Sequence, residues 1–128
     1  MRALLDTHVV LAAGGASKRL PKRIADFLLD EANALFVSSV SVWEISSKHG
    51  LGKLPLAAPP AEWLSRVIPD LDATVLPFTM SHALAVQDLD VIHRDPFDRM
   101  LICQARVEGL TLITADEFVR QYDVRTLW

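Results

Sequence analysis

The sequence contains a single cysteine, Cys103, among its 128 residues. One cysteine excludes an internal disulfide and any zinc site built on a cysteine pair, and it favours a reducing compartment. Cys103 lies in an apolar run, which indicates that it is a small buried hydrophobic side chain. We therefore expect a core that needs no disulfide or structural metal, and the length suits one domain over residues 1–128.

No apolar segment approaches the length needed to cross a membrane. The N-terminal stretch briefly resembles a signal peptide, but Asp6 and His8 interrupt it, so a cytoplasmic protein is predicted. The net charge of −3 argues against a broad surface for nucleic acid, and any such contact must be local. The hydrophobic content of 51% suggests that a partner or a second copy covers some apolar surface.

Motifs for phosphate-binding loops and for zinc are also missing. Gly14-Gly15 follows a helical turn and matches neither GxGxxG nor GxxxxGK, so no nucleotide cofactor is expected. The histidines have no zinc-ligand spacing and are interpreted as structural or surface residues; they are His8, His49, His82 and His93.

Short apolar runs alternate with segments of helical spacing along the chain. The runs predicted to be strands are residues 2–5, 34–37, 73–78 and 110–114, with 124–128 as an edge strand. The predicted helices are residues 7–13, 17–31, 38–49, 61–68, 79–87, 95–107 and 116–122. Strands that are nearly unbroken apolar runs indicate parallel pairing, so the predicted class is α/β, with a central, mostly parallel sheet covered by helices on both faces.

Four carboxylates occupy positions from which they can meet at one edge of this sheet. Asp6 ends the first strand and Asp116 follows the strand at 110–114, where open parallel sheets bind ligands. Glu44 and Asp98 begin predicted helices that can point at the same edge. Such a cluster repels itself unless cations neutralise it, and oxygen ligands suit Mg²⁺ or Mn²⁺ better than Zn²⁺. Such an ion would activate water for phosphodiester hydrolysis.

Helix capping offers another explanation for three of these acids. Residues 41–44 match a capping box that ends in Glu44, Asp98 is the third helical residue after a cap, and Asp116 can itself be a cap. Asp6 has no such explanation in the sequence. A carboxylate at the end of a buried strand must be compensated, which favours a functional role for Asp6.

Basic and aromatic residues give weaker indications. Arg94 and Arg99 flank the proposed acids, and the densest basic run is Lys18-Arg19-Leu20-Pro21-Lys22-Arg23. Either phosphate contact or a solvated helix face explains such a run. Trp43 and Trp63 are interpreted as core or interface residues and not as platforms for base stacking.

Four segments, taken together and in this order, resemble the PIN-domain family, especially toxins of the VapC type. The segments are Leu4-Leu5-Asp6-Thr7-His8, Ser38-Ser39-Val40-Ser41-Val42-Trp43-Glu44-Ile45, His93-Arg94-Asp95-Pro96-Phe97-Asp98-Arg99-Met100-Leu101-Ile102 and Thr114-Ala115-Asp116. The resemblance covers essentially the whole chain.

This resemblance implies an endoribonuclease that depends on Mg²⁺ or Mn²⁺. It places the acidic set on Asp6, Glu44, Asp98 and Asp116, with Thr114 as a small polar neighbour of the last acid. Asp6, Asp98 and Asp116 would hold metal, and Glu44 would coordinate it or orient the attacking water. The resemblance also implies homodimers and a cognate VapB-type antitoxin whose tail occupies the active-site groove, with any DNA binding left to the antitoxin.

Two other functions remain open at this point. A metal-dependent phosphatase of the haloacid-dehalogenase type also begins with a strand that ends in Asp, but it needs a second Asp where this chain has His8. A non-catalytic binding module would use its acids only as helix caps and its apolar surface for a protein partner. Activity on a small phosphate ester would favour the first, and absence of divalent-metal binding would favour the second.

Overall fold

The computed structural model describes residues 1–128 and contains a five-stranded sheet in the order β3-β2-β1-β4-β5. All four neighbouring pairs are parallel. The strands are β1 (Arg2–Leu5), β2 (Ala34–Ser38), β3 (Thr74–Leu76), β4 (Thr111–Ile113) and β5 (Thr126–Leu127). The predicted α/β class is confirmed, and the sheet is parallel throughout.

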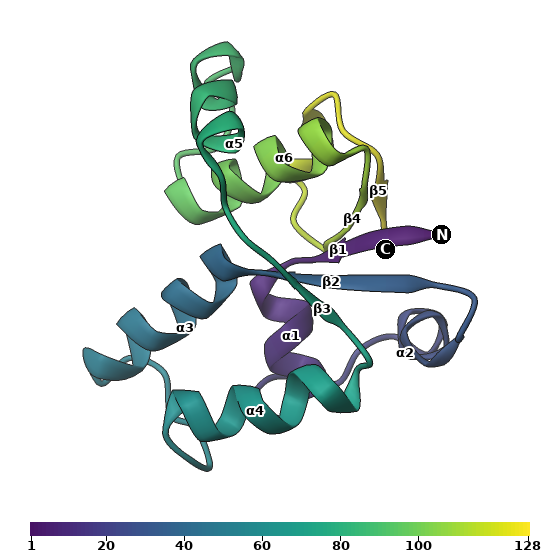
Figure 1. The fold of residues 1–128 in the computed structure, drawn as a ribbon, viewed down its shortest axis with the longest axis vertical. Coiled ribbons are helices and arrows are strands. Elements are labelled where there is room, and N and C mark those ends of the chain that lie inside the picture. The colour runs from purple at the N-terminus through teal and green to yellow at the C-terminus, as the bar shows by residue number, and fades with distance from the viewer.

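Helices cover both faces of this sheet. They are α1 (Thr7–Ala13), α2 (Lys22–Leu29), α3 (Ser39–Gly50), α4 (Pro60–Asp70), α5 (Met80–Ala85) and α6 (Pro96–Glu108), with 3₁₀ turns η1 (Val86–Asp88) and η2 (Val119–Gln121). In Figure 1, α5 and α6 lie on one side of the strands, and α1, α2 and α4 lie on the other. No helix is both long enough and apolar enough to span a bilayer.

The alternation of side chains along β1 divides the core into two parts. Ala3 and Leu5 pack with buried residues of α1, α2 and α4, whereas Leu4 packs with buried residues of α6. Successive residues of a strand point to opposite faces, so one buried strand supplies both cores. Cys103 belongs to the α6 core and is buried, as predicted.

Two predicted helices are shorter in the structure. The helix expected over residues 17–31 begins only at Lys22, because Pro21 has an extended ψ of 146° and caps it. The helix expected over residues 116–122 is reduced to the turn η2, which follows Asp116, whose side chain accepts from the N–H groups of Phe118 and Val119 as an N-cap does. The cap at Asp116 agrees with the sequence prediction, whereas apolar spacing alone predicts neither the late start of α2 nor the short length of η2.

We predict that Gly14→Ala destabilises the fold by about 1–3 kcal/mol, as overpacking of a core does. A Cβ atom on Gly14 would lie 2.3 Å from Cζ2 of Trp63 and 2.7 Å from Cγ2 of Val67, and both side chains are buried. Urea unfolding measures the loss. Gly50→Ala is the matched control, because its Cβ would meet nothing within 4 Å, and its free energy of unfolding should not fall. Equal values for the two variants would contradict this packing.

Candidate functional site

The topology brings the ends of β1 and β4 to one point. Leu5 pairs with Ile113 in register, and the Asp6 N–H donates to the Ile113 carbonyl at 3.1 Å. Strands β2 and β3 extend the sheet from one side of β1, and β4 and β5 extend it from the other. The crossovers therefore diverge beside Asp6, which is where open parallel sheets form ligand sites.

Asp6 is a buried carboxylate that also caps a helix. Its side chain is 6% exposed, and its Oδ1 accepts from the Val9 N–H at 2.8 Å at the start of α1. The expectation that capping does not explain Asp6 is therefore wrong. One carboxylate oxygen of Asp6 accepts from a free N–H at the start of α1. Burial nevertheless raises the pKa of the Asp6 carboxyl, despite hydrogen bonds from Thr114 and Val9. The helix-capping hydrogen bond alone does not offset the free-energy cost of burying the Asp6 charge.

Asp98, Asp116 and His93 form a compact cluster at the same edge. His93 Nε2 lies 2.8 Å from Asp98 Oδ2 and 3.2 Å from Asp116 Oδ2, and one ligand atom from each residue lies within 4.8 Å of the others. The Thr114 hydroxyl accepts from the Asp116 N–H at 3.1 Å and also bonds Asp6. Thr114 thus links the buried acid of β1 to this cluster.

Glu44 reaches the site from the middle of α3. Ser38 caps this helix by accepting from the Val40 N–H, so the predicted capping box over residues 41–44 is wrong. Ser41 instead bonds the Thr7 hydroxyl at 2.9 Å in the core, which ties α3 to α1. Glu44 is 4% exposed and forms an ion pair with Lys48. Its burial has no helix-capping explanation.

Sequence reasoning misses His93, because it gives no reason to place this residue at the site and interprets it as structural or surface. The loop that carries it is held by Tyr122, whose hydroxyl accepts from the Ile92 and His93 N–H groups and donates to the Asp90 carbonyl. Arg99 Nη1 also donates to the carbonyls of Asp90 and His93. The only sequence signal for His93 was its place five residues before Asp98 in the DPFD segment.

The remaining histidines need no catalytic role. His82 is fully buried, accepts from the Thr79 N–H through Nδ1, and pairs with Glu108 through Nε2. His49 bonds the Leu54 carbonyl, and His8 is exposed. The interpretation of these three as structural or surface residues agrees with their contacts. The Arg99 side chain is likewise held by its hydrogen bonds to the loop that carries His93.

The carboxylates destabilise one another. The pKa of Asp98 is raised from 3.8 to about 6, chiefly by burial; the charges on Asp95, Asp116 and Asp6 contribute to the rise, and His93 opposes it. Asp116 also raises the pKa of Asp6. A hard cation would relieve this repulsion, and two carboxylates with an imidazole within 4.8 Å form a donor set that fits a divalent ion. Asp6 and Glu44 lie at the same edge but outside this tight group.

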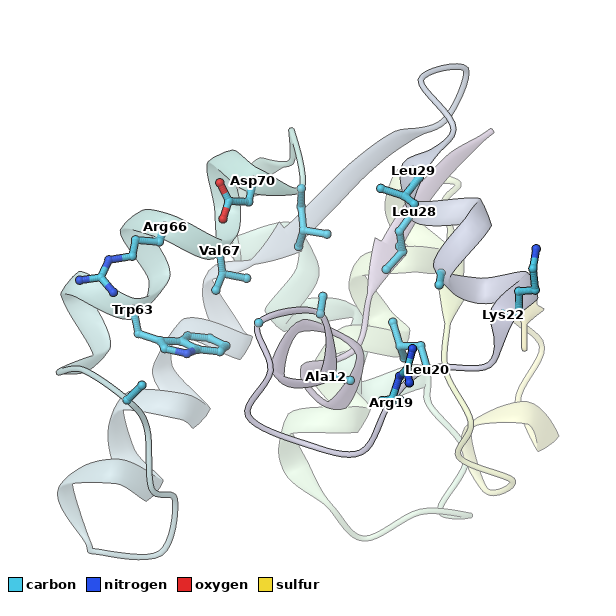
Figure 2. Close-up of a pocket in the computed structure, with 15 residues that line it drawn as sticks. Ala12, Arg19, Leu20, Lys22, Leu28, Leu29, Trp63, Arg66, Val67 and Asp70 are labelled. Carbon is cyan, nitrogen blue, oxygen red and sulfur yellow. The ribbon is translucent and has the colours of Figure 1, made fainter.

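A large apolar cavity lies elsewhere on the molecule. It is an open groove of about 910 Å³ between α1, α2 and α4, lined mainly by apolar side chains. Figure 2 shows Trp63 and Val67 pointing into it from α4, opposite Leu20 and Leu28. The groove reaches Ala12–Gly14 at the end of α1, whereas Asp6 lies at its beginning. Seven helical residues separate the two by roughly 10 Å.

Comparisons with known proteins agree with this architecture. A family model described as PIN domain matches residues 3–124. VapBC2 from Rickettsia felis, solved with a promoter DNA fragment, superposes with a TM-score of 0.72 at 18% identity, covering 99% of this chain and 98% of that one. DNA-bound VapBC from Salmonella typhimurium gives 0.70 at 21% identity, with coverages of 99% and 97%.

A toxin–antitoxin complex from Klebsiella pneumoniae gives a TM-score of 0.60 at 18% identity, covering 98% of this chain and 96% of that one. Identities this low establish the shared fold alone. Among proteins with curated descriptions, none matches this sequence.

We predict that Asp98→Asn stabilises the metal-free protein at pH 8 but not near pH 4. The folded-state pKa of about 6 lies above the unfolded value of 3.8. The stability conferred by the Asp98 proton is therefore complete below pH 3.8 and lost as the pH rises through 6. After allowance for partial solvent exposure, the gain at pH 8 should be on the order of 1 kcal/mol.

Urea unfolding in EDTA at both pH values measures this difference. Asp26→Asn is the control, because Asp26 is an exposed partner of Lys22 on α2, far from the cluster. A variant that is less stable than wild type at pH 8 would show that the Asp98 charge is favourable in the metal-free fold.

Proposed function

This chain belongs to the PIN-domain family, and we propose that it is a metal-dependent endoribonuclease that acts as the toxin of a VapBC-type pair. The observation that carries the proposal is the meeting of Asp98, Asp116 and His93 beside buried Asp6 at the end of a parallel sheet. The cluster contains no cysteine or serine, and its carboxylates suit a hard cation that activates water.

The position of each site residue suggests its role in the proposed reaction. Asp98, Asp116 and Asp6 would hold Mg²⁺ or Mn²⁺, which when bound acidifies water and offsets the charge of a phosphodiester. Glu44, fixed by Lys48, would coordinate the ion or orient the water. His93 Nε2 lies within hydrogen-bonding distance of Asp98 and Asp116, so His93 would position these two carboxylates.

We expect purified protein freed of any partner to cut cellular RNA into discrete fragments with Mg²⁺ or Mn²⁺ and to be inactive in EDTA. Asp6→Asn should reduce cleavage at least about a hundredfold while keeping the fold, since Asn caps helices as well as Asp does. Gel analysis of total RNA measures the loss. It also identifies the RNA class that is cut.

Asp26→Asn is the matched carboxylate control and should cut at the wild-type rate. Cleavage by Asp6→Asn at that same rate would rule out the proposed site. Turnover of a small phosphate ester in place of RNA would support the phosphatase alternative, and failure to bind any divalent metal would support the binding module.

The apolar groove supports a protein partner for this toxin. Its rim carries Arg19, Lys22 and Arg66 against one acid, Asp70, so a segment with apolar and acidic side chains fits it best. Similar folds have been solved as toxin–antitoxin complexes. We propose that a VapB-type antitoxin binds this groove, supplies any DNA contact, and extends its tail along α1 toward the acids. A homodimer of the toxin remains part of this proposal.

Leu29→Asp should weaken antitoxin binding and restore growth arrest in cells that express both proteins. Leu29 lines the groove and is 80% exposed, so the change adds a charge there without disturbing the core. The antitoxin would be sought in a small reading frame beside the gene, and pull-down with the expressed pair measures binding. Leu84→Asp is the control at an exposed position of α5. Equal antitoxin binding by both variants would exclude the groove.

A further inference from the structure

Two aromatic rings are exposed on this molecule, and both lie beside the candidate metal site. The chain has nine aromatic residues, of which only Trp43 and Phe118 are exposed, at 59% and 54%. Trp63 is buried, as expected for a core residue, but Trp43 is not. Because exposed aromatic area is costly in water, the placement of both rings at one site needs an explanation.

Trp43 adjoins the cluster through α3 and α6. It precedes buried Glu44, so the helical rotation between neighbours turns its ring from the core toward the rim. The ring packs edge-on against Phe97 with centroids 5.4 Å apart and planes at 83°. Phe97 directly precedes Asp98. This contact holds the Trp43 ring against the residue that precedes Asp98, while more than half of Trp43 stays exposed.

Phe118 adjoins the cluster from the β4 side. Its backbone N–H donates to Asp116 Oδ1 at 2.8 Å, and its ring lies 5.4 Å from the His93 ring at a tilt of 31°. Both rings therefore contact a residue that belongs to the acidic site or directly neighbours one of its acids. The accessible aromatic surface continues the candidate site on two sides.

Positive charge is present at the same rim. Lys48 Nζ lies 5.8 Å from the centre of the Phe97 ring, and its pKa is raised chiefly by its hydrogen bond to Glu44, with smaller contributions from Asp95 and Asp98. Arg94 is exposed one residue before Asp95. Aromatic faces with neighbouring cations are the usual means by which proteins bind single-stranded nucleic acid.

We propose that Trp43 and Phe118 are stacking platforms for the two nucleobases that flank the cleaved phosphodiester. The bond must lie at Asp98 and Asp116, so its neighbouring nucleotides extend over the two sides that carry these rings. Bases inside a duplex are already stacked and paired and cannot use them. The substrate is therefore unpaired where it is cut. The proposal rests on the ribonuclease function and specifies the substrate for the same site.

Binding is measured on Asp6→Asn protein with Mn²⁺, so that cleavage does not consume the probe. The probe is a short fluorescein-labelled single-stranded RNA of mixed sequence, with the same RNA annealed to its complement for comparison. Trp43→Leu and Phe118→Leu should each raise the Kd for the single strand about tenfold, as loss of one base stack does, without changing the Kd for the duplex. Trp43→Phe should restore most of the affinity, and Leu84→Ala should change neither Kd.

Unchanged single-strand binding by both leucine variants would overturn the proposal, and RNA cleavage by wild type would then still support the nuclease. A lower molar mass of Trp43→Leu in solution, with RNA affinity retained, would assign this face to a second copy and also overturn it. If wild type cuts no RNA and the Asp6→Asn protein binds none, the proposed function itself fails. Circular dichroism of each variant confirms that the exposed substitutions leave the fold intact.

Discussion

The parallel pairing of β1 with β4 is the constraint on which the candidate site depends. It places Asp6 beside Thr114 and Asp116, although more than a hundred residues separate the first acid from the last. Helix α6 contributes Asp98, and a hydrogen bond to the Tyr122 hydroxyl holds the loop that carries His93 next to these acids. Several carboxylates therefore lie close together at one edge of a buried sheet. The fold tolerates this charge because Thr114, Val9 and Lys48 provide hydrogen bonds to the carboxylates.

An arrangement of this kind lowers the stability of the metal-free fold at neutral pH. The acids lie where burial and mutual repulsion raise the pKa values of Asp6 and Asp98, and neither position is needed for core packing. Sites that bind metal and substrate are commonly built at such a cost. The apolar groove, at the other end of α1, is a separate surface with different chemistry. In our proposal the partner binds this groove and its tail reaches along α1 toward the acids, where the substrate binds.

The sequence predicted the elements whose apolar pattern is regular. The strand at 2–5 and the helix at 7–13 have the predicted bounds, and the acids at strand ends lie at one edge of the sheet. Features set by single distant contacts were not predictable. His93 is placed by a hydrogen bond to Tyr122, 29 residues away, and the Thr7–Ser41 bond is one of the contacts on the buried face of α3, which leaves Trp43 exposed. Apolar spacing carries no information about either contact.

Calorimetric titration of the partner-free, RNA-free protein with Mn²⁺ tests directly whether this cluster is a metal site. We expect saturable binding by wild type that Asp98→Asn and Asp116→Asn each abolish or strongly weaken, with Asp26→Asn unchanged. Binding with wild-type affinity in both cluster variants, or no binding by wild type, would contradict this expectation.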